Sequence, residues 1–260
     1  MKMHNPLSFG HWRPVLVRQP PGVSDVALTF DDGPTPETTP KLLRILEDAG
    51  AKATFFLSGI RIAAYPQLAA DIVAAGHAAY GHAWEHENLE RATAARAISS
   101  MQKVEEALAR LRPTPSPYLL RLPYNAGFNC SWMHRAMARF HSDVRFAFCT
   151  LNPRDYALAN DCPDLSTLAI RCQAAARRLC SHPSLPGSIV LLHENPFDVV
   201  AKLAPYIAEL LVPAILEGIA ARGLATGFIQ VPSSRRALDR FLLLAATHRP
   251  FHEYQRRAMA

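Results

Sequence analysis

The sequence predicts a single α/β domain, built as a distorted barrel of the (β/α)7 type. Three observations support this prediction. The chain has 260 residues, enough for one large domain with a substantial buried core. Its content of 49% hydrophobic and 19% charged residues is typical of a globular chain. Short apolar runs alternate with amphipathic segments of helical length, which indicates parallel strands joined by right-handed crossovers.

Seven apolar runs are predicted as strands: Val26–Phe30, Thr54–Leu57, His77–Tyr80, Tyr118–Leu122, Arg145–Cys149, Ile189–Leu192 and Leu224–Ile229. The helices expected between them are Pro40–Asp48 (with Thr39 as its cap), Pro66–Ala75, Arg91–Leu111, Leu165–Leu179 and Ala201–Arg222. Seven such units favour a closed or nearly closed barrel, with a doubly wound open sheet as the alternative. In either fold, catalytic groups belong at the carboxyl ends of the strands.

The barrel is assigned to residues 23–232, between an N-terminal extension (1–22) and a C-terminal helical extension (233–260). The chain contains no apolar run of transmembrane or signal-peptide length, so we expect a cytoplasmic location. The five cysteines are odd in number and include no Cys-x-x-Cys pair, which favours reduced thiols.

The net charge of +6 does not indicate a nucleic-acid partner, because the basic residues do not interleave with stacking aromatics. Much of the excess positive charge lies after Pro232, on both sides of the apolar run Phe241–Ala246. The simpler interpretation of this extension is an ordinary closing helix. The alternative is peripheral contact with the inner face of the membrane.

Asp31 and Asp32 directly follow the first predicted strand and precede a Gly-Pro turn. Two adjacent carboxylates at the end of a buried strand are electrostatically costly unless a cation neutralises them. His82 and His86 follow the third strand, and on a helical turn this spacing lets both imidazoles reach one metal ion. Two histidines and one carboxylate leave open coordination positions, as a catalytic metal site requires.

Two further strand ends carry polar groups. Arg121 closes the fourth strand, where it could pair with a carboxylate, and the chain around Tyr124 could offer a backbone N–H to an oxyanion. His193 ends the sixth strand and is a candidate general acid.

In order and spacing, four motifs resemble those of the polysaccharide deacetylases (carbohydrate esterase family 4, the NodB homology domain): Thr29–Pro34, His82-x-x-x-His86, Arg121-x-Pro123-Tyr124 and Leu191-x-His193. The resemblance implies a divalent metal held by Asp32, His82 and His86. Zinc is the most common choice, and Co²⁺, Mn²⁺ or Ni²⁺ are alternatives. It also implies Asp31 as general base, His193 as general acid and the Tyr124 backbone N–H in an oxyanion hole.

Three positions depart from the family pattern. Ala83 stands where the family usually has a serine or threonine whose hydroxyl braces the histidine loop. Tyr156 replaces the usual tryptophan of an Asp-Trp pair, and we expect the preceding Asp155 to pair with Arg121 and orient Asp31. Glu194 replaces an aspartate, a change expected to be minor.

The sequence therefore predicts a metal-dependent de-N-acetylase that acts on an amino sugar in an oligosaccharide, a polysaccharide precursor or a lipid-linked saccharide. A metal-dependent amide hydrolase for a formylated or non-sugar substrate is the alternative. A non-catalytic barrel that binds glycans or metal is less favoured, because such a protein would need neither Asp31 nor His193. A metal phosphodiesterase is weaker still, since it would usually need a second metal.

Overall fold

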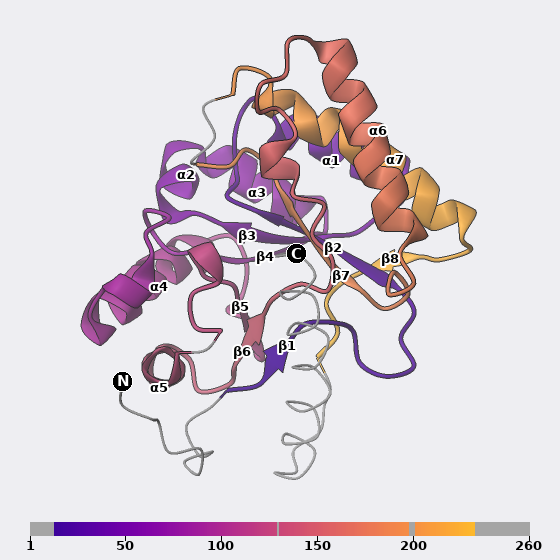
Figure 1. The fold of residues 1–260 in the computed structure, drawn as a ribbon. Coiled ribbons are helices and arrows are strands. Elements are labelled where there is room, and N and C mark those ends of the chain that lie inside the picture. Colours follow the sequence, from indigo (N-terminus) through magenta and orange to yellow (C-terminus); the bar gives the residue numbers. More distant parts are fainter. Residues whose placement is uncertain (1–12, 129, 198–200, 232–260) are drawn as a thin grey trace, which may run out of the picture.

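The computed structural model of the chain describes residues 13–128, 130–197 and 201–231 (Figure 1). Its strands are β1 (Val15–Leu16), β2 (Val26–Asp31), β3 (Thr54–Leu57), β4 (Ala78–Gly81), β5 (Tyr118–Leu120), β6 (Val144–Ala147), β7 (Ile189–His193) and β8 (Thr226–Gly227). Its α-helices are α1 (Thr39–Asp48), α2 (Gly59–Ala64), α3 (Pro66–Ala74), α4 (Ala94–Leu108), α5 (Ser131–Phe140), α6 (Leu165–Ser181) and α7 (Ile207–Ala221). Single 3₁₀ turns are η2 (Leu89–Arg91), η3 (Pro123–Asn125), η4 (Asp155–Ala157) and η5 (Ala204–Tyr206).

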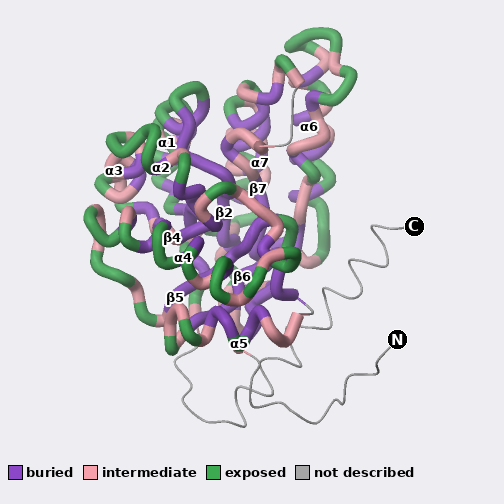
Figure 2. The backbone as a smooth tube through the Cα atoms, turned by 90° about the vertical axis from the view of Figure 1, so that its left-hand side faces the viewer, coloured by how far each residue is buried: buried purple, intermediate pink, exposed green. Residues whose placement is uncertain are grey.

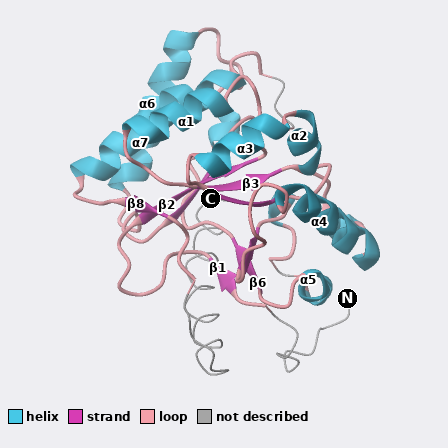
Figure 3. Cartoon of the chain, turned by 180° about the vertical axis from the view of Figure 1, so that it is seen from behind, coloured by secondary structure: helices cyan, strands magenta, loops and turns pink. Residues whose placement is uncertain are grey.

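The strands form two parallel sheets. The larger has the order β4-β3-β2-β7, with β8 also paired to β2, and the smaller has the order β1-β6-β5. Helices α1, α3, α6 and α7 cover the larger sheet, whereas α4 and α5 flank the smaller one (Figures 1 and 3). The fold is thus the predicted α/β arrangement of parallel strands, consistent with a distorted barrel, although the ladders of the described residues do not form one continuous ring.

Side chains along the strands alternate between the helices and the interior. On β2, Val26, Leu28 and Phe30 pack in the core beneath the helices, whereas Ala27 belongs to a separate interior cluster with Phe56. Strands β1, β2, β3, β5 and β6 are buried along their whole length, and much of the exposed surface lies on the outer faces of the helices (Figure 2). Because a strand has a side-chain period of two, Thr29 and Asp31 lie on the interior side with Ala27. The alternation therefore turns the polar end of β2 inward.

No ladder joins β4 to β5 within the described residues, so side chains bridge this seam. The phenol oxygen of Tyr118 accepts a hydrogen bond from Gly81 N at 3.1 Å and donates to Glu105 on α4 at 3.0 Å. Glu105 is held in turn by Arg112 and Thr114. A buried polar network thus replaces the missing backbone bonds.

Most predicted elements are present with shifted ends, but some details of the prediction were wrong. Thr39 lies inside α1 rather than capping it, and the capping residue is Thr38. The two-residue strand β1 falls in the segment assigned to the N-terminal extension, yet it pairs with β6 and is buried.

Helices α2 and α5 were not predicted. The six-residue α2 is too short for periodicity to reveal it. The buried positions of α5, Met133, Ala136 and Met137, show the helical spacing that could have identified it.

One stretch, Ala204–Ala221, is long and apolar enough to cross a membrane by length and composition alone, contrary to the sequence-based expectation. This is weak evidence for a span, because a core helix passes the same test. In the structure 44% of the stretch is buried, and α7 packs against α6 and α1. The C-terminal extension, for which membrane contact was the alternative to a closing helix, lies outside the described residues.

The Tyr118 bridge predicts a measurable contribution to stability. Tyr118→Phe leaves the buried Gly81 N–H without its acceptor, so the free energy of unfolding should fall by about 1–3 kcal/mol. Urea unfolding measures this loss, with Tyr65→Phe, at an exposed tyrosine, as the control. Equal stability of the two variants would show that the bridge does not hold the seam.

Candidate active site

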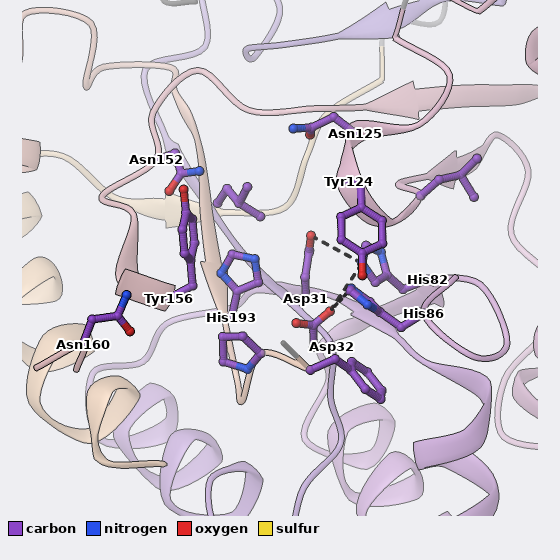
Figure 4. A pocket seen from close by; sticks show the side chains of 14 residues that line it. Asp31, Asp32, His82, His86, Tyr124, Asn125, Asn152, Tyr156, Asn160 and His193 are labelled. Carbon is purple, nitrogen blue, oxygen red and sulfur yellow. Dashed lines mark ion pairs between the residues drawn. The ribbon is translucent and has the colours of Figure 1, made fainter. Parts of the chain in front are cut away.

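A cavity of about 500 Å³ opens at the carboxyl ends of the strands (Figure 4). It is lined by Asp31, Asp32, His82, His86, Leu122, Tyr124, Asn125, Asn152, Tyr156, Asn160, Leu191, His193, Pro196 and Phe197. The polar residues predicted at four separate strand ends therefore meet in one place. Parallel strands produce this convergence, because all their carboxyl ends lie on the same rim.

Asp31 is held by a buried ion pair with Arg121. The Nη1 atom of Arg121 lies 2.8 Å from Asp31 Oδ1 and also donates to Thr29 Oγ1 at 2.7 Å. Its Nε and Nη2 donate to the carbonyls of Ala147 and Phe148 at 2.8 and 2.9 Å. The guanidinium is only 2% exposed, so it requires these partners. The expectation that Arg121 pairs with a carboxylate is confirmed, and Asp31 is fixed at the cavity wall.

Asp32, His82 and His86 bring one ligand atom each to a common point. Asp32 Oδ1 lies 3.4 Å from His82 Nε2 and 3.0 Å from His86 Nε2, and all three atoms lie within 4.8 Å of one another (Figure 4). Asp32 leaves strand β2 with a φ of 77°, which takes its side chain away from that of Asp31. The two adjacent carboxylates therefore face different partners.

The donor set fits a divalent metal. Asp32 Oδ1 is buried and makes no hydrogen bond of good geometry within the described part of the chain, although it lies between two imidazole nitrogens. His82 Nδ1 lies 2.9 Å from the Arg121 carbonyl, which requires the proton on Nδ1 and leaves Nε2 free to bind a cation. Burial lowers the pKa of His82, which favours the neutral form that a metal needs. Burial alone would raise the pKa of Asp32, but His86 and the other histidines lower it to about 2.

The two histidines are not on a helical turn, and that part of the prediction was wrong. Residues 82–88 form an irregular loop, in which Ala83 and His86 have φ values of 61° and 57°. The chain reverses through these left-handed residues, and the imidazole rings still approach to 5.4 Å between centroids. The loop therefore brings both imidazoles to one point, as the i, i+4 spacing on a helical turn was expected to do.

Asp155 pairs with His193 and not with Arg121, which overturns the predicted pairing. Its Oδ1 lies 2.8 Å from His193 Nδ1, and its Oδ2 accepts the backbone N–H of His193 at 2.7 Å. The physical reason is that Arg121 is already saturated by Asp31, Thr29 and two carbonyls. Burial disfavours a charged imidazole, but Asp155 outweighs it and raises the pKa of His193 to about 9. His193 is therefore protonated at neutral pH, as a general acid must be.

Tyr124 lies at the rim of the cavity. Its side chain is 54% exposed, and its ring is tilted against His86 with centroids 5.1 Å apart. Tyr124 and Asn125 both have left-handed backbones, with φ of 58° and 56°. The oxyanion role of the Tyr124 N–H stays a prediction.

Three cavity residues were not predicted as site residues: Asn125, Asn152 and Asn160, which contribute neutral amide groups. Tyr156, which stands in place of the usual tryptophan, meets the His193 ring edge-on with centroids 5.7 Å apart. The only signal for the asparagines is their position in loops that follow β5 and β6.

Phe197 was also missed. Its ring stacks on His86, with centroids 4.7 Å apart and planes 14° apart, and the Arg61 guanidinium covers its other face at 3.8 Å. No local pattern in the sequence links these three residues.

Glu194 fills the space beneath the Asp31–Gly33 turn. Its backbone N–H donates to the Asp31 carbonyl at 3.1 Å, and its carboxyl accepts a hydrogen bond from Thr39. A Cβ at Gly33 would lie 1.6 Å from Glu194 Oε1, so glycine is required there. Burial raises the pKa of Glu194 to about 7.

Comparison with known proteins identifies the family. Residues 18–136 match the family model described as polysaccharide deacetylase. A chitooligosaccharide deacetylase from Bradyrhizobium sp. (strain ANU 289) is 31% identical over 175 residues, which are 67% of this chain and 72% of that protein. The chain belongs to the polysaccharide deacetylase family. The family predicted from the four motifs is confirmed, and with it the prediction of an enzyme that acts on N-acetyl amide bonds.

Two further proteins are similar to this deacetylase. The peptidoglycan-N-acetylmuramic acid deacetylase of Bacillus subtilis (strain 168) is 36% identical over 107 residues, which are 40% of this chain and 22% of that protein. The crystal structure of a peptidoglycan N-acetylglucosamine deacetylase in complex with 4-naphthalen-1-yl-N-oxidanyl-benzamide has a TM-score of 0.66 and 25% identity, and the match covers 84% of this chain and 91% of that one.

The Asp155–His193 pair predicts a specific pH dependence. Asp155→Asn keeps the shape of the side chain but removes the charge, so the pKa of His193 should fall from about 9 toward the ordinary value of 6.5. The alkaline limb of the kcat/KM profile should then move to lower pH, because the acid loses its proton earlier. Asp161→Asn, at an exposed aspartate of the same loop, is the control. An alkaline limb that stays in place would contradict the assignment of His193 as the acid tuned by Asp155.

Proposed function

We propose that this polysaccharide deacetylase is metal-dependent and removes the N-acetyl group from a neutral amino sugar. One observation carries the proposal: a metal-competent triad, a separately held carboxylate and an imidazole paired with a carboxylate all face the same cavity. Hydrolysis of an unactivated amide needs these three parts, which are electrophilic assistance, a base for the water and an acid for the leaving amine.

Asp32, His82 and His86 are the residues that would hold the metal. A divalent ion there would polarise the acyl carbonyl and lower the pKa of a water to about 7. Two imidazoles and one carboxylate are a ligand set typical of zinc and leave positions open for substrate and water. Co²⁺, Mn²⁺ and Ni²⁺ are alternatives with the same donors.

The reaction then follows from the positions of the remaining side chains. Asp31 accepts a proton from the attacking water as the new C–O bond forms, and its second oxygen stays on Arg121. The Tyr124 backbone N–H would donate to the acyl oxygen as it gains negative charge. His193 donates its proton to the amide nitrogen as the C–N bond breaks, so the products are acetate and a free amine. Asp155 stabilises the charged imidazole before this transfer.

The lining of the cavity supports a neutral sugar. Asn125, Asn152, Asn160 and Tyr156 offer amide and hydroxyl groups suited to sugar hydroxyls, and neither lysine nor arginine lines the cavity within the described part of the chain. A sugar that carries its own carboxylate, such as N-acetylmuramic acid, would meet the carboxylates of Asp31 and Asp32, and the charged His193 in the lining is already paired with Asp155. We therefore place this chain's substrate with the chitooligosaccharides of its Bradyrhizobium relative. A cytoplasmic location stays part of the proposal, and for residues 233–260 peripheral membrane contact stays the alternative to an ordinary closing helix.

The metal assignment predicts a loss of bound zinc. His82→Ala and His86→Ala each remove a ligand, so elemental analysis after dialysis against limiting zinc should show a large loss relative to wild type. His182→Ala, at an exposed histidine, should keep the wild-type content. Full retention of zinc in both ligand variants would exclude this site.

The substrate assignment is tested by acyl release across a panel. Zinc-loaded enzyme should release acetate from N-acetylglucosamine oligomers and at least about tenfold less from N-acetylmuramic acid glycans, because the latter place a carboxylate near two others. His193→Ala should lower the rate by about 10²–10⁴-fold, and metal-free enzyme should be inactive. Preference for the muramic substrate would overturn the neutral-sugar proposal, and release of formate alone would favour the formyl alternative.

A further inference from the structure

The histidine loop, residues 82–88, has a strained backbone that contacts from other parts of the chain must hold in place. Ala83 and His86 both have left-handed backbones, which cost a non-glycine residue of the order of 1 kcal/mol each and persist only when surrounding contacts enforce them. The methyl side chain of Ala83 can make no hydrogen bond. His82 is fixed by its Nδ1 contact with the Arg121 carbonyl. His86 Nε2 faces Asp32 Oδ1 at 3.0 Å, but no hydrogen bond to its Nδ1 corresponds to that of His82 within the described residues, so the orientation of its ring also depends on the loop and on the rings that pack against it.

Helix α4 supplies a hydroxyl to this loop. The Oγ of Ser100 accepts the backbone N–H of Trp84 at 2.8 Å and donates to Glu87 Oε1 at 2.8 Å. The other oxygen of Glu87 accepts the backbone N–H of Glu85 at 2.8 Å. Ser100 is buried, and both hydrogen-bonding roles of its hydroxyl are used on the loop, whereas a serine inside a helix commonly bonds its own backbone. The result is a closed chain of hydrogen bonds that spans residues 84–87.

Helix α2 holds the other side of the same loop. The N–H groups of Gly59 and Ile60 donate to the carbonyls of Ala83 and Trp84 at 3.0 and 2.9 Å. The Trp84 ring packs against Gly59, where a Cβ would lie 2.2 Å from Trp84 Cε3. These contacts fix the first half of the loop, before Glu85. Ser100 and Glu87 restrain the rest of the loop, which contains His86.

We propose that Ser100 and Glu87 are positioning residues that hold His86 in the geometry needed to bind the metal. This inference rests on the proposed metal site. Neither side chain is a ligand; they act by fixing the loop backbone on both sides of Glu85 and His86. The hydroxyl absent at position 83 is thereby replaced by one from a helix that lies later in the sequence.

The direct test is zinc affinity, measured by competition with a chromophoric chelator. Ser100→Ala should raise the zinc Kd by about 10–100-fold, the range typical of outer-sphere partners of metal ligands. Ser99→Ala changes the adjacent, exposed serine of the same helix and should leave the Kd unchanged. The melting temperature of each metal-free variant shows whether Ser100→Ala merely destabilises α4. A wild-type melting temperature with weakened zinc binding supports positioning.

Glu87 provides a second test that does not depend on Ser100. Glu87→Gln keeps an oxygen that can accept the Glu85 N–H, and its NH2 group can donate to Ser100 Oγ, whereas Glu87→Ala removes both contacts. If Glu87 acts by hydrogen bonding, glutamine should retain most of the zinc affinity that alanine loses. Equal losses in both variants would instead indicate a charge effect on the metal and overturn the positioning role.

The outcomes separate the two proposals. Wild-type protein that binds no zinc would overturn the metal site itself, and the positioning role with it. Wild-type protein that loses zinc on His86→Ala but keeps full affinity in Ser100→Ala would leave the metal site intact and refute the positioning role alone.

Discussion

The buried ion pair between Asp31 and Arg121 is the interaction on which the rest of the site depends. A guanidinium that is 2% exposed must have a carboxylate partner, since an unpaired buried charge is strongly destabilising. Arg121 also bonds Thr29 on β2 and the carbonyls of Ala147 and Phe148 at the end of β6. One side chain thus ties together the ends of strands from both sheets, which share no ladder at the β4–β5 seam.

This pair also separates the roles of two neighbouring carboxylates. Asp31 belongs to β2, and the two-residue period of the strand turns it inward toward Arg121. Asp32 leaves the strand with a φ of 77° and faces His82 and His86. Arg121 thereby occupies one oxygen of Asp31, while Asp32 is left to the histidines. The division that we propose between proton transfer and metal binding rests on this local backbone geometry and on one buried cation.

The strand ends could be predicted from sequence, and the connections between them could not. Buried apolar runs identified where β2, β4, β5 and β7 end, and parallel strands necessarily bring those ends to one rim. The partner of Asp155 was predicted wrongly, because Arg121 and His193 both lie at that rim and spacing along the chain does not choose between them. The loop at His82–His86 was predicted as a helical turn, since left-handed residues other than glycine leave little trace in a sequence. Ser100 was missed because it lies on a helix that offers no motif.

The central claim, that Asp31 transfers protons and Asp32 binds the metal, is tested most directly by comparing two isosteric variants. Zinc affinity and turnover of an N-acetylglucosamine oligomer would be measured in parallel for Asp31→Asn and Asp32→Asn. The account predicts that Asp32→Asn loses zinc, whereas Asp31→Asn keeps near wild-type affinity but falls by at least about 10²-fold in kcat. Equal loss of zinc in both variants, or near-native turnover by Asp31→Asn, would contradict it.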